Sequence, residues 1–368
     1  MKTSSVEQPI VVQQKAEITQ IAAHQESEAS AWKRVVAGAT LALVAVTGVS
    51  LETASPAAAE QQAPVAVPFS GRSAVLASHP EGITETFGTW NILGANHVAA
   101  GRAEGGSVAA RTSREVKAIV NHKIGITGLQ EVEPVQRELI KHAAPANLVL
   151  IGDKDSDSPI LVDRDKYDVL DHGNVLIPGY QDRGLHAGAK ATFVTVRNKL
   201  TDEITDVTNS HAVAHNELPG SDRGGAQKRE RAADKIVKFH EDKLRKNPTH
   251  TQVALGDFNS SYKRRGTDKK TPIEKNDGPM NTLIYCKATA NNLMQDAYDM
   301  EKGITGKCPT KEPPKNLTYV VDHIFMTGIL AEAGVNTTVD WDVVKTADTK
   351  HTSDHFLLTA TKKSVLVP

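Results

Sequence analysis

Residues 253–259 read Val-Ala-Leu-Gly-Asp-Phe-Asn, an apolar run that ends in an acid, an aromatic ring and an amide. A short apolar run that stops at a glycine predicts a buried strand. Because side chains alternate along an extended chain, Asp257 and Asn259 are expected on one side of it and Phe258 in the core. Taken alone, the stretch is equally well explained by a turn in which Asp257 and Asn259 bond to their own backbone.

The same pattern, a short apolar run beside polar residues, recurs on both sides of this stretch. Strand ends that carry polar groups form sites at the edge of a sheet, so we expect these side chains to converge. Besides Asp257 and Asn259, the converging residues are Asn91 in TWNIL, Glu131 in GLQEVE, His211 in TNSH, Asp322 in VDHIF, and Asp354 with His355 in TSDH.

The hydrophobic pattern predicts more strands than helices, with the helices interspersed. One helix is expected at 107–122, with Ser107 as its N-cap, and another at 226–246. This order favours two packed sheets that are covered by helices. Strands are expected at 86–92, 126–130, 148–151, 160–162, 191–196, 203–210, 253–255, 319–326 and 356–361.

Carboxylates, amides and two histidines in one place are the groups that hydrolysis of a phosphate ester needs. The reaction takes a metal to neutralise the phosphate oxygens, a base to orient and deprotonate water, and donors for the developing charge. Glu131 follows the apolar run ITGL and suits a hard divalent cation such as Mg²⁺. The same residues would also be found in an ordinary exposed acidic loop. Asp257 would orient the water, and Asn259 would hold that water or a phosphate oxygen.

The two histidines have separate expected roles. His355 is expected to donate to the phosphate or to the leaving oxygen. Consecutive residues do not face each other, so Asp354 is expected to serve a metal or another histidine, such as His211, rather than His355. His215 follows His211 by four residues, but the preceding run is strand-like and a helical zinc pair is not expected. Each residue alone is compatible with ordinary packing or a surface position.

Residues 1–59 are expected to be a leader for export. Lys33 and Arg34 precede an apolar stretch at 35–49 and a small-residue run that ends at Ala59, the expected cleavage point. The stretch is shorter than the roughly 20 apolar residues of a membrane span. Acidic residues in the long segment before it leave an uncleaved anchor as the alternative, and only then would the membrane be a partner. A linker is expected at 60–82 and one folded domain at 83–362.

Charge and cysteine content limit which nucleic-acid, disulfide and zinc sites the chain can contain. The 368 residues hold 43 basic and 44 acidic side chains, so a nucleic-acid site must be a local patch. The only cysteines, Cys286 and Cys308, would form a disulfide in an oxidising compartment, with two unpaired thiols as the alternative. With no further cysteine, a structural zinc site is not expected.

In this order, the motifs WN, LQE, N-x-H, GDFN, DHIF and SDH resemble the endonuclease/exonuclease/phosphatase superfamily, which includes deoxyribonuclease I and neutral sphingomyelinases. The resemblance covers about residues 86–361. It implies an α/β fold, a four-layer α/β sandwich of two packed mixed β-sheets flanked by helices, with the active site at one edge. It also implies a metal-dependent phosphoric ester hydrolase that uses Mg²⁺, with Mn²⁺ or Ca²⁺ as alternatives.

Site roles follow from the resemblance residue by residue. Metal binding is assigned to Glu131 and Asp354, the latter with histidine orientation as its alternative. Asn91 is assigned to metal-bound solvent or phosphate, both histidines to the phosphate, Asp257 to the attacking water with help from Asn259, and Asp322 to a supporting part. Leu93 stands where abasic-site endonucleases carry an acid, which argues against that branch. No phosphate contact is assigned near Asp163 and Arg164.

A secreted nuclease is the expected function, with nucleic acid as substrate and no stable protein partner. Five basic residues at 263–270 follow GDFN, and such a segment binds a phosphate backbone or is simply a solvated loop. A sphingomyelinase-like phospholipase or a small phosphoester phosphatase is the alternative, although the low aromatic content of 4% counts against membrane insertion. A catalytically inactive surface binding module is less expected, because Glu131, Asp257 and His355 are all present.

Overall fold

The computed structural model describes most of the chain from residue 70 onward. Of the two compact units at Met1–Ala63 and Pro64–Pro368, only the second contains described residues. The predictions for the leader, the cysteines, His215 and the basic residues at 263–270 lie outside the described residues. No helix among those described is long and apolar enough to cross a membrane. The described residues are 70–99, 106–177, 189–213, 222–259, 293–301, 321–327, 334–346, 348–349 and 352–367.

The first sheet has six strands in the order β11-β12-β1-β2-β4-β3. It is mixed, because β1 and β2 run parallel and all other neighbours run antiparallel. Its strands are β1 (Ile83–Asn91), β2 (Ile126–Gln130), β3 (Leu148–Ile151), β4 (Ile160–Asp163), β11 (Val335–Val344) and β12 (Leu357–Leu366).

The second sheet also has six strands, in the order β5-β6-β7-β8-β10-β9. Here β7 and β8 form the parallel pair, and the remaining pairs are antiparallel. Its strands are β5 (Tyr167–Ile177), β6 (Ala189–Asn198), β7 (Ile204–His211), β8 (Thr251–Asp257), β9 (Gln295–Asp296) and β10 (Asp322–Met326).

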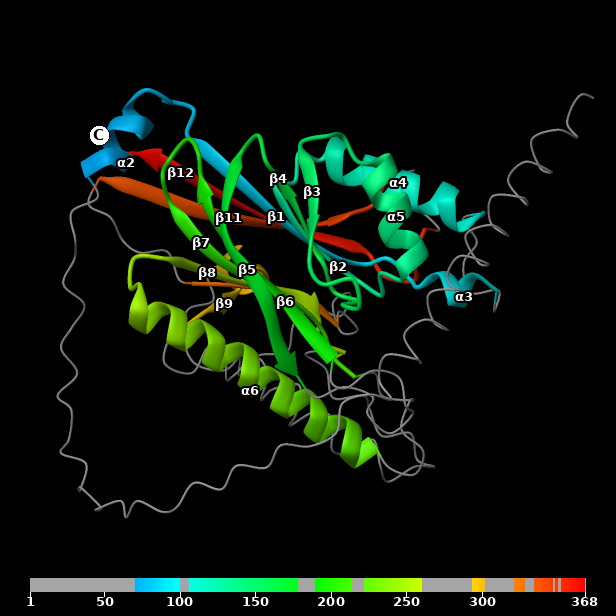
Figure 1. The fold of residues 1–368 in the computed structure, drawn as a ribbon. Coiled ribbons are helices and arrows are strands. Elements are labelled where there is room, and N and C mark those ends of the chain that lie inside the picture. Colours follow the sequence, from blue (N-terminus) through cyan, green and yellow to red (C-terminus); the bar gives the residue numbers. More distant parts are fainter. Residues whose placement is uncertain are drawn as a thin grey trace, which may run out of the picture. The chain divides into compact units, whose positions relative to one another are not determined.

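The two sheets pack face to face, and helices cover their outer faces (Figure 1). The central core joins Phe87 and Leu358 of the first sheet to Val207 and Val253 of the second. Helices α4 (Val108–Asn121) and α5 (Pro134–Ala143) cover the first sheet, and α6 (Asp222–Lys246) covers the second. The described fold is therefore the expected four-layer α/β sandwich. Three short helices complete it: α2 (Ser70–Ala77), α3 (Ala95–Ala99) and α8 (Ala297–Glu301).

The first long helix begins where its cap predicts. The Ser107 side chain accepts a hydrogen bond from the Ala110 amide at 3.2 Å, which satisfies one of the free N–H groups at the start of α4. The structure differs from the predicted linker, because α2 lies within it and buries Leu76 to 1% exposure. The final strand also continues to Leu366, past the predicted domain end.

Candidate active site

Strand direction brings the polar residues to one edge of the sandwich. The parallel strands β1 and β2 end side by side, so Asn91 lies next to the start of the loop that carries Glu131. The parallel strands β7 and β8 also end together, with His211 level with Asp257. Strand β10 runs antiparallel to β8, which places its first residue, Asp322, beside Asp257. The predicted convergence at strand ends thus follows from the sheet topology.

Asp257 occupies the centre of this cluster. Its side chain is 1% exposed, and its Oδ2 accepts a hydrogen bond from Asn91 Nδ2 at 3.1 Å. The same oxygen lies 3.7 Å from His211 Nε2 and 3.8 Å from His355 Nε2. Its Oδ1 accepts a hydrogen bond from the backbone amide of Asn259 at 2.8 Å, and this bond fixes the orientation of the carboxylate. One buried carboxylate therefore faces two imidazoles.

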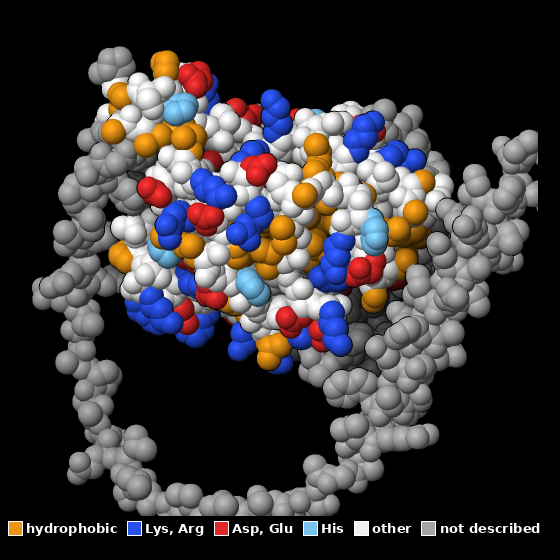
Figure 2. Space-filling model, turned by 45° about the horizontal axis from the view of Figure 1, so that its top comes forward, with side chains coloured by type: hydrophobic (Ala, Val, Ile, Leu, Met, Phe, Trp, Pro, Cys, Tyr) orange, Lys and Arg blue, Asp and Glu red, His pale blue; other side chains and the backbone are white. Residues whose placement is uncertain are grey.

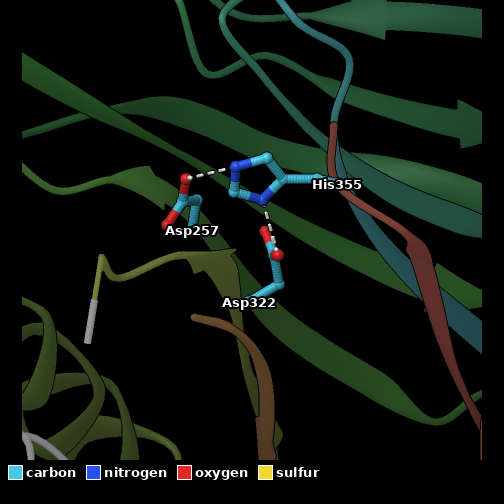
Figure 3. Close-up of side chains that lie close together, drawn as sticks. All are labelled: Asp257, Asp322 and His355. Atoms are coloured by element: carbon cyan, nitrogen blue, oxygen red, sulfur yellow. Dashed lines mark hydrogen bonds and ion pairs between the residues drawn. The ribbon is translucent and has the colours of Figure 1, made fainter. Parts of the chain in front are cut away.

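His355 is held by Asp322, as Figure 3 shows. Its Nδ1 lies 2.8 Å from Asp322 Oδ2, so Nε2 points toward Asp257. Burial on its own would lower the pKa of His355, but the carboxylates of Asp322 and Asp257 outweigh it and raise the pKa well above the ordinary value. The imidazole is therefore protonated at neutral pH and can donate from Nε2 to a phosphate oxygen.

His211 has an equivalent partner in Asp157, which the sequence interpretation did not identify. Its Nδ1 lies 3.3 Å from Asp157 Oδ2, while Nε2 faces the cluster and lies 3.9 Å from Glu131 Oε1. Burial would lower the pKa of His211, but the hydrogen bond to Asp157 and the charge of Asp257 outweigh it and raise the pKa to about 9. Two imidazolium donors thus flank Asp257.

Glu131 reaches the cluster from a strained position after β2. Its backbone has φ 59°, a left-handed conformation that non-glycine residues adopt at a cost of about 1 to 3 kcal/mol. One carboxylate oxygen accepts from Asn91 Nδ2 at 3.0 Å and the other from the Gly94 amide at 2.9 Å. Burial would raise the pKa of Glu131, but the charge of His211 and these two hydrogen bonds lower it below its ordinary value. His97 Nε2, which the motifs did not indicate, lies 3.5 Å away.

A family model described as the Endonuclease/Exonuclease/phosphatase family matches residues 88–355, which span every residue of this cluster. The chain belongs to this family. As a member of it, the chain is a phosphoesterase, and the resemblance drawn from the motifs is confirmed. No curated protein sequence shows significant similarity to the chain.

Solved structures agree with the family fold. An endonuclease/exonuclease/phosphatase from Bacteroides vulgatus is 20% identical with a TM-score of 0.52, and the match covers 76% of this chain and 98% of that one. A functionally unknown conserved protein from Enterococcus faecalis is 17% identical with a TM-score of 0.51, covering 75% and 98%. A family protein from Bacteroides thetaiotaomicron is 16% identical with a TM-score of 0.50, covering 76% and 95%. At these identities the likeness concerns the fold alone.

The side chains of two residues assigned from the family pattern make their contacts outside the central cluster. The Asn259 side chain donates to the Ala212 carbonyl at 2.8 Å and so ties the ends of β7 and β8 together. Asp354 is exposed, and its carboxylate lies 3.5 Å from the Ser353 hydroxyl. Asp322, rather than its neighbour Asp354, is the acid that bonds to His355. The roles predicted for Asn259 in solvent binding and for Asp354 in metal binding stay predictions.

The acids of the cluster fit a divalent cation, as expected for this family. Asp257 and Asp322 each offer a carboxylate oxygen, and these oxygens lie within 4.8 Å of each other and of a ring nitrogen of His355. Asp322 Oδ1 is buried without a hydrogen-bond partner, so one carboxylate oxygen has its lone pairs available. Glu131 adds a second ionised carboxylate on the other side of Asn91. Oxygen donors of this kind suit Mg²⁺, Mn²⁺ or Ca²⁺.

A fully buried arginine positions the loops that carry Asn91 and His355. Arg111 of α4 is 0% exposed and donates to three backbone carbonyls. Two of them, Ile92 at 2.9 Å and Leu93 at 2.8 Å, follow Asn91, and the third, Thr352 at 2.6 Å, precedes His355. Loop carbonyls that would otherwise be unpaired thus hold the two ends of the site in a fixed relation.

A second buried arginine positions the loop that carries Asp157, the residue that bonds to His211. Arg137 of α5 is 5% exposed and donates to the carbonyls of Gly152 at 3.1 Å, Asp153 at 2.7 Å and Ser156 at 2.8 Å. These residues form the loop that leads into Asp157. Composition gives no sign of these roles, because arginines on helices are usually solvated.

Glu115 of α4 is a buried acid beside Arg111, and its ionisation affects the stability of the fold. Its carboxylate oxygens have no hydrogen-bond partner, and Arg111 Nη1 lies 3.9 Å away. Burial raises the pKa of Glu115 from 4.5 to about 8, although the charges of Arg111 and Arg114 oppose the rise. The unfolded chain therefore releases this proton at lower pH than the folded chain, and ionisation between pH 4.5 and 8 favours unfolding.

Replacing Glu115 by glutamine is expected to raise the free energy of unfolding by about 2 to 4 kcal/mol at pH 8, and the gain should vanish below about pH 4. Denaturant unfolding at both pH values measures this difference. Glu138→Gln, at an exposed position of α5, is the matched control and should change little at either pH. A Glu115→Gln gain that is the same at both pH values would contradict the raised pKa.

Proposed function

We propose that the chain is an extracytoplasmic, metal-dependent nuclease that hydrolyses phosphodiester bonds with an activated water. The observation that carries this proposal is the carboxylate of Asp257 between two imidazoles, at 3.7 Å from His211 and 3.8 Å from His355. A base flanked by two cationic donors matches the needs of in-line attack on a phosphorus centre, where water loses a proton while negative charge grows on the oxygens.

Each group has a defined part in this reaction. Asp257 orients the attacking water and accepts its proton, and Asn91 keeps the carboxylate in place through the hydrogen bond at 3.1 Å. His211 and His355 donate from their Nε2 atoms to the phosphate oxygens or to the leaving oxygen. Asp157 and Asp322 hold each ring by its Nδ1 atom and favour the protonated form. The proton that Asp257 removes and the proton that a histidine supplies balance each turnover.

The cation would be held by Glu131 with Asp322 or Asp257, and Asp354 is proposed as a further ligand. Mg²⁺ or Mn²⁺ is proposed, with Ca²⁺ as the third choice, because the donors are hard oxygen atoms. When bound, such an ion supplies charge neutralisation at the phosphate. Asn259 is proposed to assist, because its backbone amide holds the Asp257 carboxylate by a hydrogen bond of 2.8 Å.

The surface provides one observation for a second candidate function. Figure 2 shows basic and acidic side chains interspersed over the face it draws, rather than a uniformly basic surface. Together with a net charge of −1, this pattern suits a smaller phosphoester, such as a phospholipid headgroup or a sugar phosphate. An inactive binding module is disfavoured, because the buried acid, both histidines and their carboxylate partners are all present.

Export is proposed from residues 1–59 alone, with cleavage after Ala59 and an uncleaved membrane anchor as the alternative. Mass determination of the chain recovered from culture medium tests it. A mature protein that begins at Glu60 supports export and cleavage, whereas intact chain retained in the membrane fraction supports the anchor.

Nicking of supercoiled plasmid by the purified chain tests the reaction itself. We expect relaxed circles in the presence of Mg²⁺ or Mn²⁺ and none after chelation by EDTA, because the acidic cluster needs the cation to approach a phosphate. Restored nicking after the cation is added back excludes damage by the chelator. A folded protein that cleaves a phosphomonoester or a phospholipid but no nucleic acid would shift the function to the second candidate.

A further inference from the structure

One aromatic side chain at the edge of the site is not used by the chemistry above. Phe356 follows His355 directly and is 55% exposed. Among the phenylalanine, tyrosine and tryptophan side chains that the structure describes, it is the one that is more than half exposed. Consecutive Cα atoms are about 3.8 Å apart, so the backbone of Phe356 lies directly beside that of His355, a proposed catalytic residue.

The strand register shows at which edge of the sandwich this ring lies. Strands β11 and β12 pair Val343 with Leu358 and Val344 with Leu357. Val343 and Leu358 pack on the core between the sheets, whereas Val344 and Leu357 pack on the outer core beneath α4. Lys345 and Phe356 come next, just beyond the ends of these two strands, and so lie at the edge of the sandwich where β1 also ends and the catalytic cluster lies.

The Lys345 side chain lies beside that of Phe356 at this edge. Its Nζ lies over the Phe356 ring, 5.2 Å from the ring centroid. A lysine over one side of an aromatic ring leaves the other side to a planar ligand and adds a positive charge beside it. The same register places Phe356 next to the end of β1, where Asn91 enters the cluster, because Leu358 pairs with Thr89.

We propose that Phe356 and Lys345 form a substrate subsite that stacks a nucleobase beside the scissile phosphate and contacts a neighbouring phosphate. This inference rests on the proposed nuclease function and names the feature of the substrate that the site recognises. Stacking on an aromatic ring accepts any base, so the subsite gives affinity for nucleic acid without sequence preference. The lysine supplies the salt-dependent part of that affinity.

Two matched oligonucleotides test the subsite, one with ordinary bases and one with abasic sugars on both sides of a single cleavable bond. Phe356→Ala is expected to raise KM for the base-bearing oligonucleotide about 5- to 100-fold, and the difference from the wild type should fall below about threefold on the abasic one. Phe356→Trp should restore KM, because it keeps a stacking surface. Lys345→Gln should raise KM on both and reduce its dependence on salt.

Leu176→Ala is the control, because Leu176 is also exposed, at 65%, and lies on β5. It should leave both KM values unchanged. Equal KM values for the wild type and Phe356→Ala on the base-bearing oligonucleotide would overturn the subsite and leave the nuclease function standing. A wild type that cleaves neither oligonucleotide but does cleave another phosphoester would overturn the nuclease function, and the subsite with it.

Discussion

Replacement of Asp257 by asparagine is expected to lower kcat by about 10³-fold or more, with KM nearly unchanged. The asparagine side chain keeps the shape of the aspartate and can still accept the hydrogen bond from the Asn259 backbone amide, but it cannot accept a proton from water. It also removes the negative charge that lies 3.7 and 3.8 Å from the two histidines, so their hold on protons weakens. Single-turnover rates on a labelled oligonucleotide, with Mg²⁺ in excess, measure the chemical step directly.

Asp206→Asn is the matched control for this substitution. Asp206 is also a buried aspartate of the second sheet, and it accepts from Thr195 at 2.6 Å and Gln252 at 3.1 Å. It lies on β7, five residues before His211, which corresponds to about 16 Å along the strand. The control should cost stability and leave kcat within about threefold of the wild type. Near-wild-type turnover by Asp257→Asn would remove Asp257 from the site.

The contrast between these two aspartates shows how far periodicity predicts a site. The run Val253–Leu255 and the residues that follow it indicate a buried strand with an acid at its end, and β8 confirms this. Parallel pairing of β7 with β8 then places His211 beside Asp257. A pattern of short apolar runs and the polar residues at their ends therefore carries most of the information about which groups meet.

Loop contacts are not encoded in that pattern. Asp157 bonds to His211 from a loop after β3, and His97 lies beside Glu131 from α3, yet neither residue ends an apolar run. Such residues are placed by loop geometry, which the buried arginines help to set. A signal for Asp157 did exist, since Asp153, Asp155 and Asp157 alternate with other residues in a short polar stretch. It does not indicate which acid faces the site.

The sequence predicts the pairing of acids with histidines only in part. The argument that consecutive residues do not face each other separates Asp354 from His355, and the structure agrees, because Asp354 is exposed. The partner of His355 is Asp322, which lies 33 residues earlier in the chain and enters the site only because β10 pairs with β8. That pairing is a property of sheet order, which local sequence does not determine.

Asp322→Asn is expected to lower kcat by about 10²- to 10⁴-fold. An amide at this position cannot balance the charge on His355, so the raised pKa of the imidazole falls toward its ordinary value and the fraction that can donate from Nε2 decreases. It also no longer holds Nδ1 in the protonated form. The rate of the chemical step, measured as for Asp257→Asn, reports this loss.

The chain contains a second aspartate–histidine pair of the same length, which separates catalysis from stability. His323 Nδ1 lies 2.8 Å from Asp296 Oδ2, the same distance as in the pair of His355 with Asp322, and both side chains of this second pair are buried. Asp296→Asn should therefore destabilise the fold by a similar amount while leaving kcat within about threefold, because His323 alternates with Asp322 along β10 and stacks on Phe325, with ring centroids 5.5 Å apart. Equal losses of kcat in both variants would show that Asp322 supports the fold rather than the charge on His355.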